Sequence, residues 1–114
     1  MEGPFELQDI DEHVEDGSCG VYLLGRYGDH PRYVGRSDTC RIRSEILDAA
    51  YNRGRRYLRF WFEYCTSPMK AYKGECAYYH SLGGDEGLLD NHYHPARPWY
   101  THWKCPCDDC DYHR

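Results

Sequence analysis

Alternating and helical patterns of apolar residues predict three strands and two helices. The first strand covers residues 20–27 and the second covers residues 32–35. The four residues between them, G-D-H-P at 28–31, have the composition of a turn, so the pair is expected to form a β-hairpin. Residues 57–65 alternate with period two, which predicts a third strand whose side chains point to opposite faces in turn.

The two predicted helices follow the second and third strands. One runs from a cap at Ser37 or Asp38 to about Asn52, before the helix-ending Gly54. The other covers residues 67–82 and begins with a Ser-Pro pair typical of an N-cap and first helical position. Its inner stripe is expected to hold Met69, Tyr72, Cys76 and Tyr79. The order ββαβα predicts an α+β fold with a small three-stranded antiparallel sheet flanked by helices.

Length and composition predict one domain with two short flanking segments. The chain has 114 residues, enough for a single modest core. Residues 1–16 are read as a loose acidic lead-in that could hold a short helical turn, residues 17–98 as the folded domain, and residues 99–114 as a cysteine-rich tail. No apolar run approaches the length of a membrane span, and the N-terminus does not resemble a signal peptide. We therefore expect a soluble, cytoplasmic protein with no membrane partner.

Charge is distributed unevenly along the chain. The net charge is −5, but residues 26–73 carry eleven Lys and Arg against five acids. The acidic excess lies in residues 1–16, with seven acids and no Lys or Arg, and in residues 74–114. The basic middle would attract a nucleic-acid backbone. A solvated charge distribution without a partner is the alternative, and charge alone does not decide between them.

Five residues in a fixed order carry the functional prediction. Tyrosines occupy the motifs G-V-Y at residues 20–22 and Y-V-G at residues 33–35, and Arg43, Glu75 and Asn91 follow. The arginine lies in the first predicted helix, the glutamate in the second, and the asparagine just beyond it. This ordered set resembles the GIY-YIG nuclease domain over about residues 19–98, with Val in place of Ile in both motifs.

The resemblance implies a divalent-metal-dependent DNA endonuclease that hydrolyses phosphodiester bonds. It assigns Tyr22 as the general base, Arg43 as the arginine that binds the scissile phosphate, and Glu75 as the ligand of a single Mg²⁺ or Mn²⁺. Tyr33 and Asn91 would complete the site. An unperturbed phenol has a pKa of about 10, so Tyr22 would need nearby positive charge to act as a base near neutral pH.

Two further arginines are candidates for substrate contacts. Arg36 directly follows the second motif, where relatives commonly carry Lys or Arg, and Arg41 precedes the helix arginine. Some relatives place a histidine one turn after that arginine, but here the position is Leu47. This departure increases the dependence of the predicted chemistry on Tyr22.

Each candidate also has an ordinary structural interpretation. The tyrosines could be core residues of the hairpin, the arginines could lie on a solvated helix face, and Asn91 could cap a turn. Glu75 could be a surface residue, although its i±4 neighbours Ala71 and Tyr79 carry no positive charge. The resemblance favours the functional interpretation because it requires all of them together.

The seven cysteines form two groups. Cys19, Cys40, Cys65 and Cys76 lie in or beside predicted core elements, where buried free thiols are expected. The tail holds Cys105, Cys107, Cys110 and His113, which together would make a tetrahedral Zn²⁺ site with three thiolates and one imidazole. The crowded spacing is unlike that of structural sites built from two separate ligand pairs. A flexible terminus with reactive thiols, or a cysteine that pairs between chains, is the alternative.

The sequence therefore supports three candidate functions. The first is the DNA endonuclease. The second is a DNA-binding module of the same fold that does not cut, or that needs a partner to cut. The third is a structural or regulatory protein whose cysteine-rich tail is the functional part. With so little chain outside the domain, target choice would come from loops, a homodimer or a partner protein.

Overall fold

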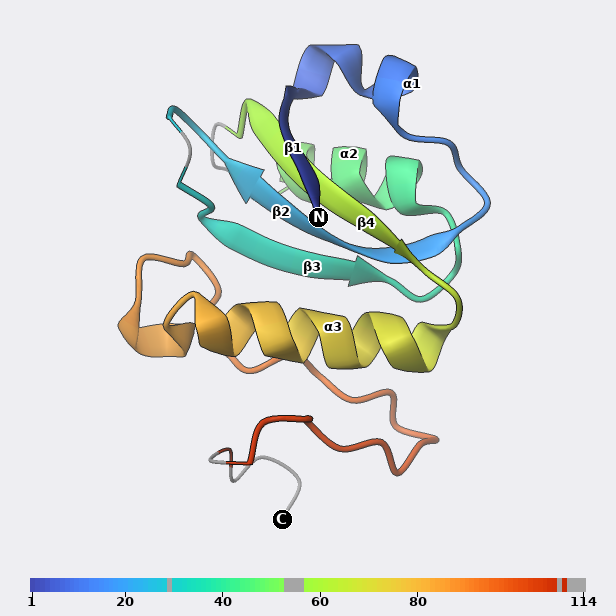
Figure 1. Ribbon diagram of the computed structural model, residues 1–114, viewed down its shortest axis with the longest axis vertical. Helices are drawn as coiled ribbons and strands as arrows, with labels where there is room; N and C mark the ends of the chain where they lie inside the picture. Colours follow the sequence, from blue (N-terminus) through green and yellow to red (C-terminus); the bar gives the residue numbers. More distant parts are fainter. Residues whose placement is uncertain (29, 53–56, 109, 111–114) are drawn as a thin grey trace.

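The strands and helices assemble into one antiparallel sheet with helices on both faces. The computed structural model describes residues 1–28, 30–52, 57–108 and 110. Within these residues the sheet has four strands in the order β1-β4-β2-β3, and α3 covers one face while α1 and α2 cover the other (Figure 1). The elements are β1 (Glu2–Glu6), η1 (Leu7–Asp9), α1 (Ile10–His13), β2 (Cys19–Gly25), β3 (Tyr33–Ser37), α2 (Ile42–Asn52), β4 (Arg59–Cys65), α3 (Pro68–Ser81) and η2 (Gly84–Glu86).

The α+β class is confirmed, but the predicted sheet of three strands is wrong. In the described part of the chain a fourth strand, β1, pairs antiparallel with β4, placing Phe5 opposite Phe60. The first sixteen residues, expected to be a loose lead-in, bury Leu7, Ile10 and Val14 in the core. Their few apolar residues lie between acidic ones, so no strand or helical period is visible there. Tertiary burial, rather than local pattern, orders this segment.

Two apolar clusters hold the sheet between its helices. On the α2 face, Tyr22, Leu24, Phe60 and Phe62 pack with Ile42 and Ile46. On the α3 face, Val21, Leu23, Val34 and Trp61 pack with Tyr79. Because both faces of β2 are covered, all of its residues are buried. Apolar runs without alternation are typical of strands buried on both faces.

Both long helices have side-chain caps. Ser67 accepts a hydrogen bond from the Lys70 amide, as expected for α3. At α2, Ser37 Oγ accepts from the Arg41 amide, and Asp16 accepts from the first-turn amides of Arg43 and Ser44. The predicted end of this helix at Gly54 lies outside the described residues. Met69, expected on the inner stripe of α3, is 36% exposed, and Ala71 and Glu75 are buried there instead.

Two of the cysteines expected as free thiols are bonded to each other. Cys19 at the start of β2 and Cys40 before α2 form a disulfide bond. Cys65 and Cys76 are free, and Cys76 is fully buried. Burial raises the pKa of Cys76 to about 12, so this thiol is neutral and unreactive at neutral pH. The disulfide joins the first motif strand to the loop that follows the second.

The described chain after η2 has no helix or strand, and much of it lies along α3 on the side away from the sheet (Figure 1). Ring packing between Trp103 and Tyr72 attaches it to the helix, with ring centroids 6.3 Å apart. Arg97 donates to the Trp103 carbonyl within the segment. Across all of the described residues, every helix is too short or too polar to span a bilayer.

Candidate active site

The glycine of each motif allows close approach of another group. Tyr22 and Gly35 are direct partners in the β2–β3 ladder, and a Cβ on Gly35 would overlap the Tyr22 ring. A Cβ on Gly20 would overlap the Glu63 carbonyl and approach Ile42 Cδ1 to 2.6 Å. The glycine in Y-V-G is therefore required so that the Tyr22 ring can lie across β3. The close contact between Gly35 and the Tyr22 ring gives a physical reason why the two motifs occur on neighbouring strands.

The two motif tyrosines lie on the same face of the hairpin. Their ring centroids are 6.4 Å apart, and the ring of Tyr57 lies 6.1 Å beyond that of Tyr33. Tyr22 is 5% exposed and Tyr33 is 8% exposed, so both contribute to the core as well as to any site. This deep burial is consistent with the interpretation of both tyrosines as core residues of the hairpin. Whether either tyrosine could also take part in chemistry depends on the cleft that it lines.

Tyr22 lines a cleft of about 270 Å³ beside α2. Arg36 from β3 lines the same cleft, and α2 contributes Glu45 and Asp48. Glu45 accepts a hydrogen bond from Thr39, while its second oxygen, Oε2, is buried without a hydrogen-bond partner among the described residues. The cleft is thus lined by a tyrosine, an arginine and two acidic residues, which are residue types used in acid–base chemistry.

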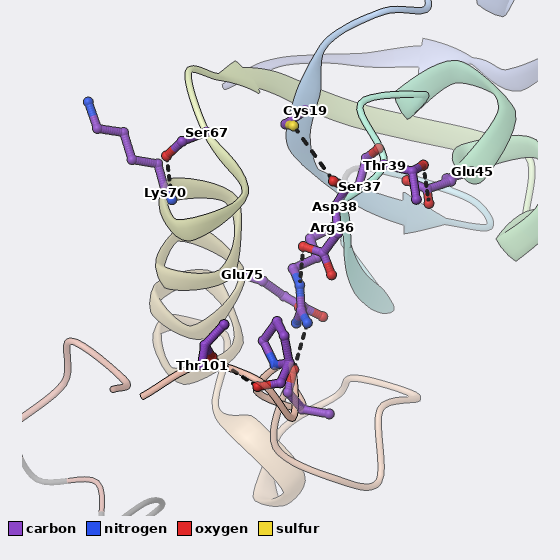
Figure 2. A network of polar contacts seen from close by, with 12 residues as sticks. Cys19, Arg36, Ser37, Asp38, Thr39, Glu45, Ser67, Lys70, Glu75 and Thr101 are labelled. Carbon is purple, nitrogen blue, oxygen red and sulfur yellow. Dashed lines mark hydrogen bonds and ion pairs between the residues drawn. The ribbon is translucent and has the colours of Figure 1, made fainter. Parts of the chain in front are cut away.

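Arg36 is the centre of the polar network beside this cleft. Its guanidinium lies 2.6 Å from Glu75 and 2.8 Å from Asp38, and it donates to the Ala96 carbonyl at 2.6 Å (Figure 2). The same group lies 5.1 Å from the centroid of the Tyr72 ring. Burial alone would lower the pKa of Arg36, but the hydrogen bond with Asp38 and the charge of Glu75 raise it above its ordinary value. Arg36 is therefore held as a fixed, partly buried positive charge.

Glu75 lies in the middle of α3 and is 7% exposed. Its partner is Arg36 on the sheet, not a neighbour on its own helix. The sequence interpretation considered only the i±4 positions and missed this ion pair. A burial this deep requires such a partner, because an uncompensated carboxylate in the core is strongly unfavourable.

The structure does not bring Arg43 to Tyr22 and Glu75. At 100° per residue, Arg43 lies on the flank of α2 opposite to the residues that line the cleft. Its guanidinium faces the acidic N-terminal segment, 3.6 Å from Asp11 and 4.0 Å from Asp16. Arg41 is exposed and lies one helical turn before Glu45, on the cleft flank. Of these two arginines, Arg41 has the better access to the cleft.

Asn91 binds the outer edge of β3. Its side-chain oxygen accepts from the Val34 amide and its side-chain nitrogen donates to the Val34 carbonyl, both at 2.9 Å. The adjacent Asp90 carboxylate accepts hydrogen bonds from Arg26 and Tyr57, each at 2.7 Å. Asn91 thereby takes the place of a neighbouring strand at an edge that would otherwise be unpaired. With Tyr33 it also lines a second cleft of about 290 Å³.

A separate His/Cys cluster lies at the far end of α3. Among the described residues, His80, His94, Cys105 and Cys110 place their metal-binding atoms within 4.8 Å of one another. Cys107 was predicted as a ligand but does not belong to this group. The other predicted ligand, His113, lies outside the described residues. No local spacing connects His80 and His94 to the cysteines of the tail, so the sequence alone does not indicate them as ligands.

Comparison with protein-family models, curated proteins and solved structures found no match to this chain. The resemblance to the GIY-YIG domain therefore stays a prediction carried by the motifs. In this chain Tyr22 and Arg36 line one cleft, and Glu75 forms an ion pair with Arg36. Arg43 and Asn91 make other contacts.

Proposed function

We propose that the protein is a DNA endonuclease that hydrolyses phosphodiester bonds at the cleft between Tyr22 and Arg36. The observation that carries the proposal is that one residue from each motif strand, Tyr22 and Arg36, lines the same cleft. Glu75 supports the arrangement through its ion pair with Arg36. The basic block of residues 26–73 would attract the DNA backbone toward this part of the chain.

Hydrolysis requires removal of a proton from water as it attacks phosphorus, and stabilisation of charge on the phosphate oxygens. Tyr22 is the candidate base. An uncompensated positive charge near Tyr22, such as Arg36 released from its carboxylate partners, would favour the ionised phenol, which is the form that can accept the proton. After release of its present contacts, Arg36 could donate two parallel hydrogen bonds to the phosphate oxygens, and Arg41 could add a contact from the exposed flank. The leaving oxygen departs with a proton taken from solvent.

The glutamate implied as metal ligand does not fit a metal in this arrangement. A cation bound at Glu75 Oε1 would compete with the Arg36 nitrogen that lies 2.6 Å away. The like charges of Arg36 and Mg²⁺ would also repel each other at that distance. We therefore derive no step through a metal. Dependence on Mg²⁺ or Mn²⁺ stays a separate prediction, and the assay below tests it directly.

The existing contacts of the Arg36 guanidinium favour a second candidate function. Asp38, Glu75 and Ala96 all engage the guanidinium, so a phosphate would have to displace at least one of them. A DNA-binding module that does not cut, or that cuts only when a partner protein or a second copy rearranges this network, is consistent with these contacts. Target choice would then also come from the partner.

A cleavage assay separates the endonuclease from the DNA-binding module. It uses supercoiled, single-stranded and branched DNA, with Mg²⁺ or Mn²⁺ and with chelator. For the endonuclease we expect cleavage products, reduced at least about 100-fold by Tyr22→Phe, the loss expected when a general base is removed. Loss of these products in the presence of chelator tests separately whether Mg²⁺ or Mn²⁺ is required. Glu75→Gln, which keeps the shape and an acceptor for Arg36, should reduce the products too. The matched controls Tyr93→Phe and Glu86→Gln change exposed residues and should cut normally.

Binding measured on the same DNA completes the test. A wild-type protein that does not cut but gives a salt-sensitive gel shift would support the second candidate and reject the first. Absence of both cutting and binding would reject both. Cleavage that survives Tyr22→Phe would reject the assignment of the base while leaving the activity itself in place.

A further inference from the structure

Four metal-binding side chains from three parts of the chain converge beside the end of α3. In the described chain, His80 comes from the last turn of the helix, His94 from the following loop, and Cys105 and Cys110 from the tail. Their nitrogen and sulfur atoms lie within 4.8 Å of one another. Zinc bound tetrahedrally at its usual bond lengths places such atoms about 3.3–3.8 Å apart. Small side-chain movements would therefore close the set around one ion.

The histidines have the surroundings of metal ligands. The His80 Nε2 atom is buried and has no hydrogen-bond partner among the described residues, which a buried ring nitrogen requires. In His94, Nδ1 lies 2.9 Å from the Pro95 carbonyl oxygen. A ring that donates its Nδ1 proton to a carbonyl presents Nε2 to a metal, and this outer hydrogen bond is the usual support of a zinc-bound histidine. The two ring centroids are 5.1 Å apart.

We propose that His80, His94, Cys105 and Cys110 bind one Zn²⁺ in a closed structural site. Two imidazoles and two thiolates satisfy the four positions of tetrahedral zinc, and soft sulfur ligands disfavour Mg²⁺ or Ca²⁺. Neither Cys105 nor Cys110 forms a disulfide bond. The site uses two of the tail cysteines predicted for zinc, replaces Cys107 and His113 with histidines from the domain, and so joins the tail to α3.

The site would also position the segment beside the cleft. Zinc would hold the chain at His94 and at Cys105, and the segment between these ligands includes Ala96 and Trp103. Ala96 accepts the hydrogen bond from Arg36, and Trp103 packs on Tyr72. This part of the chain has no helix or strand of its own, so a metal would supply order that the backbone does not. The zinc proposal stands independently of the proposed nuclease activity.

The first test is metal content together with cysteine alkylation on the full-length protein. We expect one zinc per chain by elemental analysis. Mass spectrometry after alkylation should show Cys107 modified and Cys105 and Cys110 protected, and a strong chelator should remove the protection and lower Tm. No zinc in protein prepared with added Zn²⁺, or equal modification of all three cysteines, would overturn the proposal.

Variants and cobalt substitution identify the ligands. Cys105→Ser, Cys110→Ser and His94→Asn should each lose the stoichiometric zinc, while the matched control Cys107→Ser should keep it. If a variant fails to fold, the spectrum of the Co²⁺-substituted wild-type protein still decides, because its charge-transfer intensity reports the number of thiolates. A spectrum of three thiolates, or loss of zinc in Cys107→Ser alone, would assign the site to the tail and refute the set with His80 and His94.

Discussion

Replacement of Asn91 tests whether its side chain closes the edge of the sheet or takes part in chemistry. Asn91→Ala removes the hydrogen bonds to both the amide and the carbonyl of Val34. Each contributes about 1 kcal/mol net, and loss of a partner for a buried group adds to the cost. Val34 is fully buried, so water reaches its backbone only through the space that the deletion opens. We expect a loss of about 2–3 kcal/mol in the free energy of unfolding.

Asn91→Asp separates the two hydrogen bonds. The carboxylate can still accept from the Val34 amide, but its other oxygen faces the Val34 carbonyl, where the wild-type nitrogen donates. We expect this variant to be at least as unstable as Asn91→Ala at neutral pH. Below about pH 4 the carboxyl becomes protonated and can donate, so part of the stability should return relative to the wild type.

Urea or thermal unfolding followed by circular dichroism measures these changes. For a chain of this size, about 2 kcal/mol corresponds to roughly 8 °C in Tm. The neighbouring His92→Ala serves as control, since His92 is exposed and should change stability by less than about 0.5 kcal/mol. Unchanged stability in Asn91→Ala, combined with lost DNA cleavage, would refute the edge-closing role and favour a direct role in catalysis.

Two further substitutions test the packing of the motifs and the cap of α2. Gly35→Ala should destabilise the fold and disrupt the cleft, because the added Cβ overlaps the Tyr22 ring. Chemical denaturation measures the loss in the free energy of unfolding, and a variant as stable as the wild type would contradict the packing argument. Asp16→Ala should cost about 1 kcal/mol, since Asp16 caps the first turn of α2 and accepts from Ser44 Oγ at 2.7 Å. Burial tends to raise the pKa of Asp16, but the hydrogen bonds from Ser44 outweigh it and the pKa is lowered. The contribution of Asp16 to the free energy of unfolding is therefore complete above about pH 4, the ordinary pKa of an aspartate. It is lost as the pH falls through the lowered pKa of the folded state. The difference in stability between the wild type and Asp16→Ala should therefore shrink in acid, as measured by unfolding experiments.

The elements of the fold that follow from local pattern were predictable from the sequence. The hairpin, α2, β4 and the Ser67 cap of α3 each have a turn, a period or a capping residue that acts over a few positions. β1 does not, because it is ordered by pairing with β4, which begins more than fifty residues away. The Cys19–Cys40 disulfide depends in the same way on how the hairpin brings two loops together.

The candidate site was predictable in its residue types but not in its contacts. Spacing along the chain correctly placed Tyr22 on the hairpin and Glu75 inside α3. It could not show that Arg36 reaches Glu75, or that α2 turns Arg43 toward Asp11, because these outcomes depend on the rotation of each helix about its axis. The packing of the whole core sets the rotation of each helix. The His/Cys cluster was hidden for a similar reason, since its ligands come from three separate segments.

The contacts of Arg36 set a condition on any function that uses this cleft. Charge-assisted hydrogen bonds contribute about 1.5–3 kcal/mol each, so displacement of Asp38 or Glu75 by a phosphate would be largely an exchange of one anion for another. The Ala96 carbonyl is neutral and leaves Arg36 most readily. Access of a phosphate to Arg36 therefore depends on movement of the segment that carries Ala96, which begins beside His94. A fixed segment would favour the closed network, and a released one would open the guanidinium to substrate.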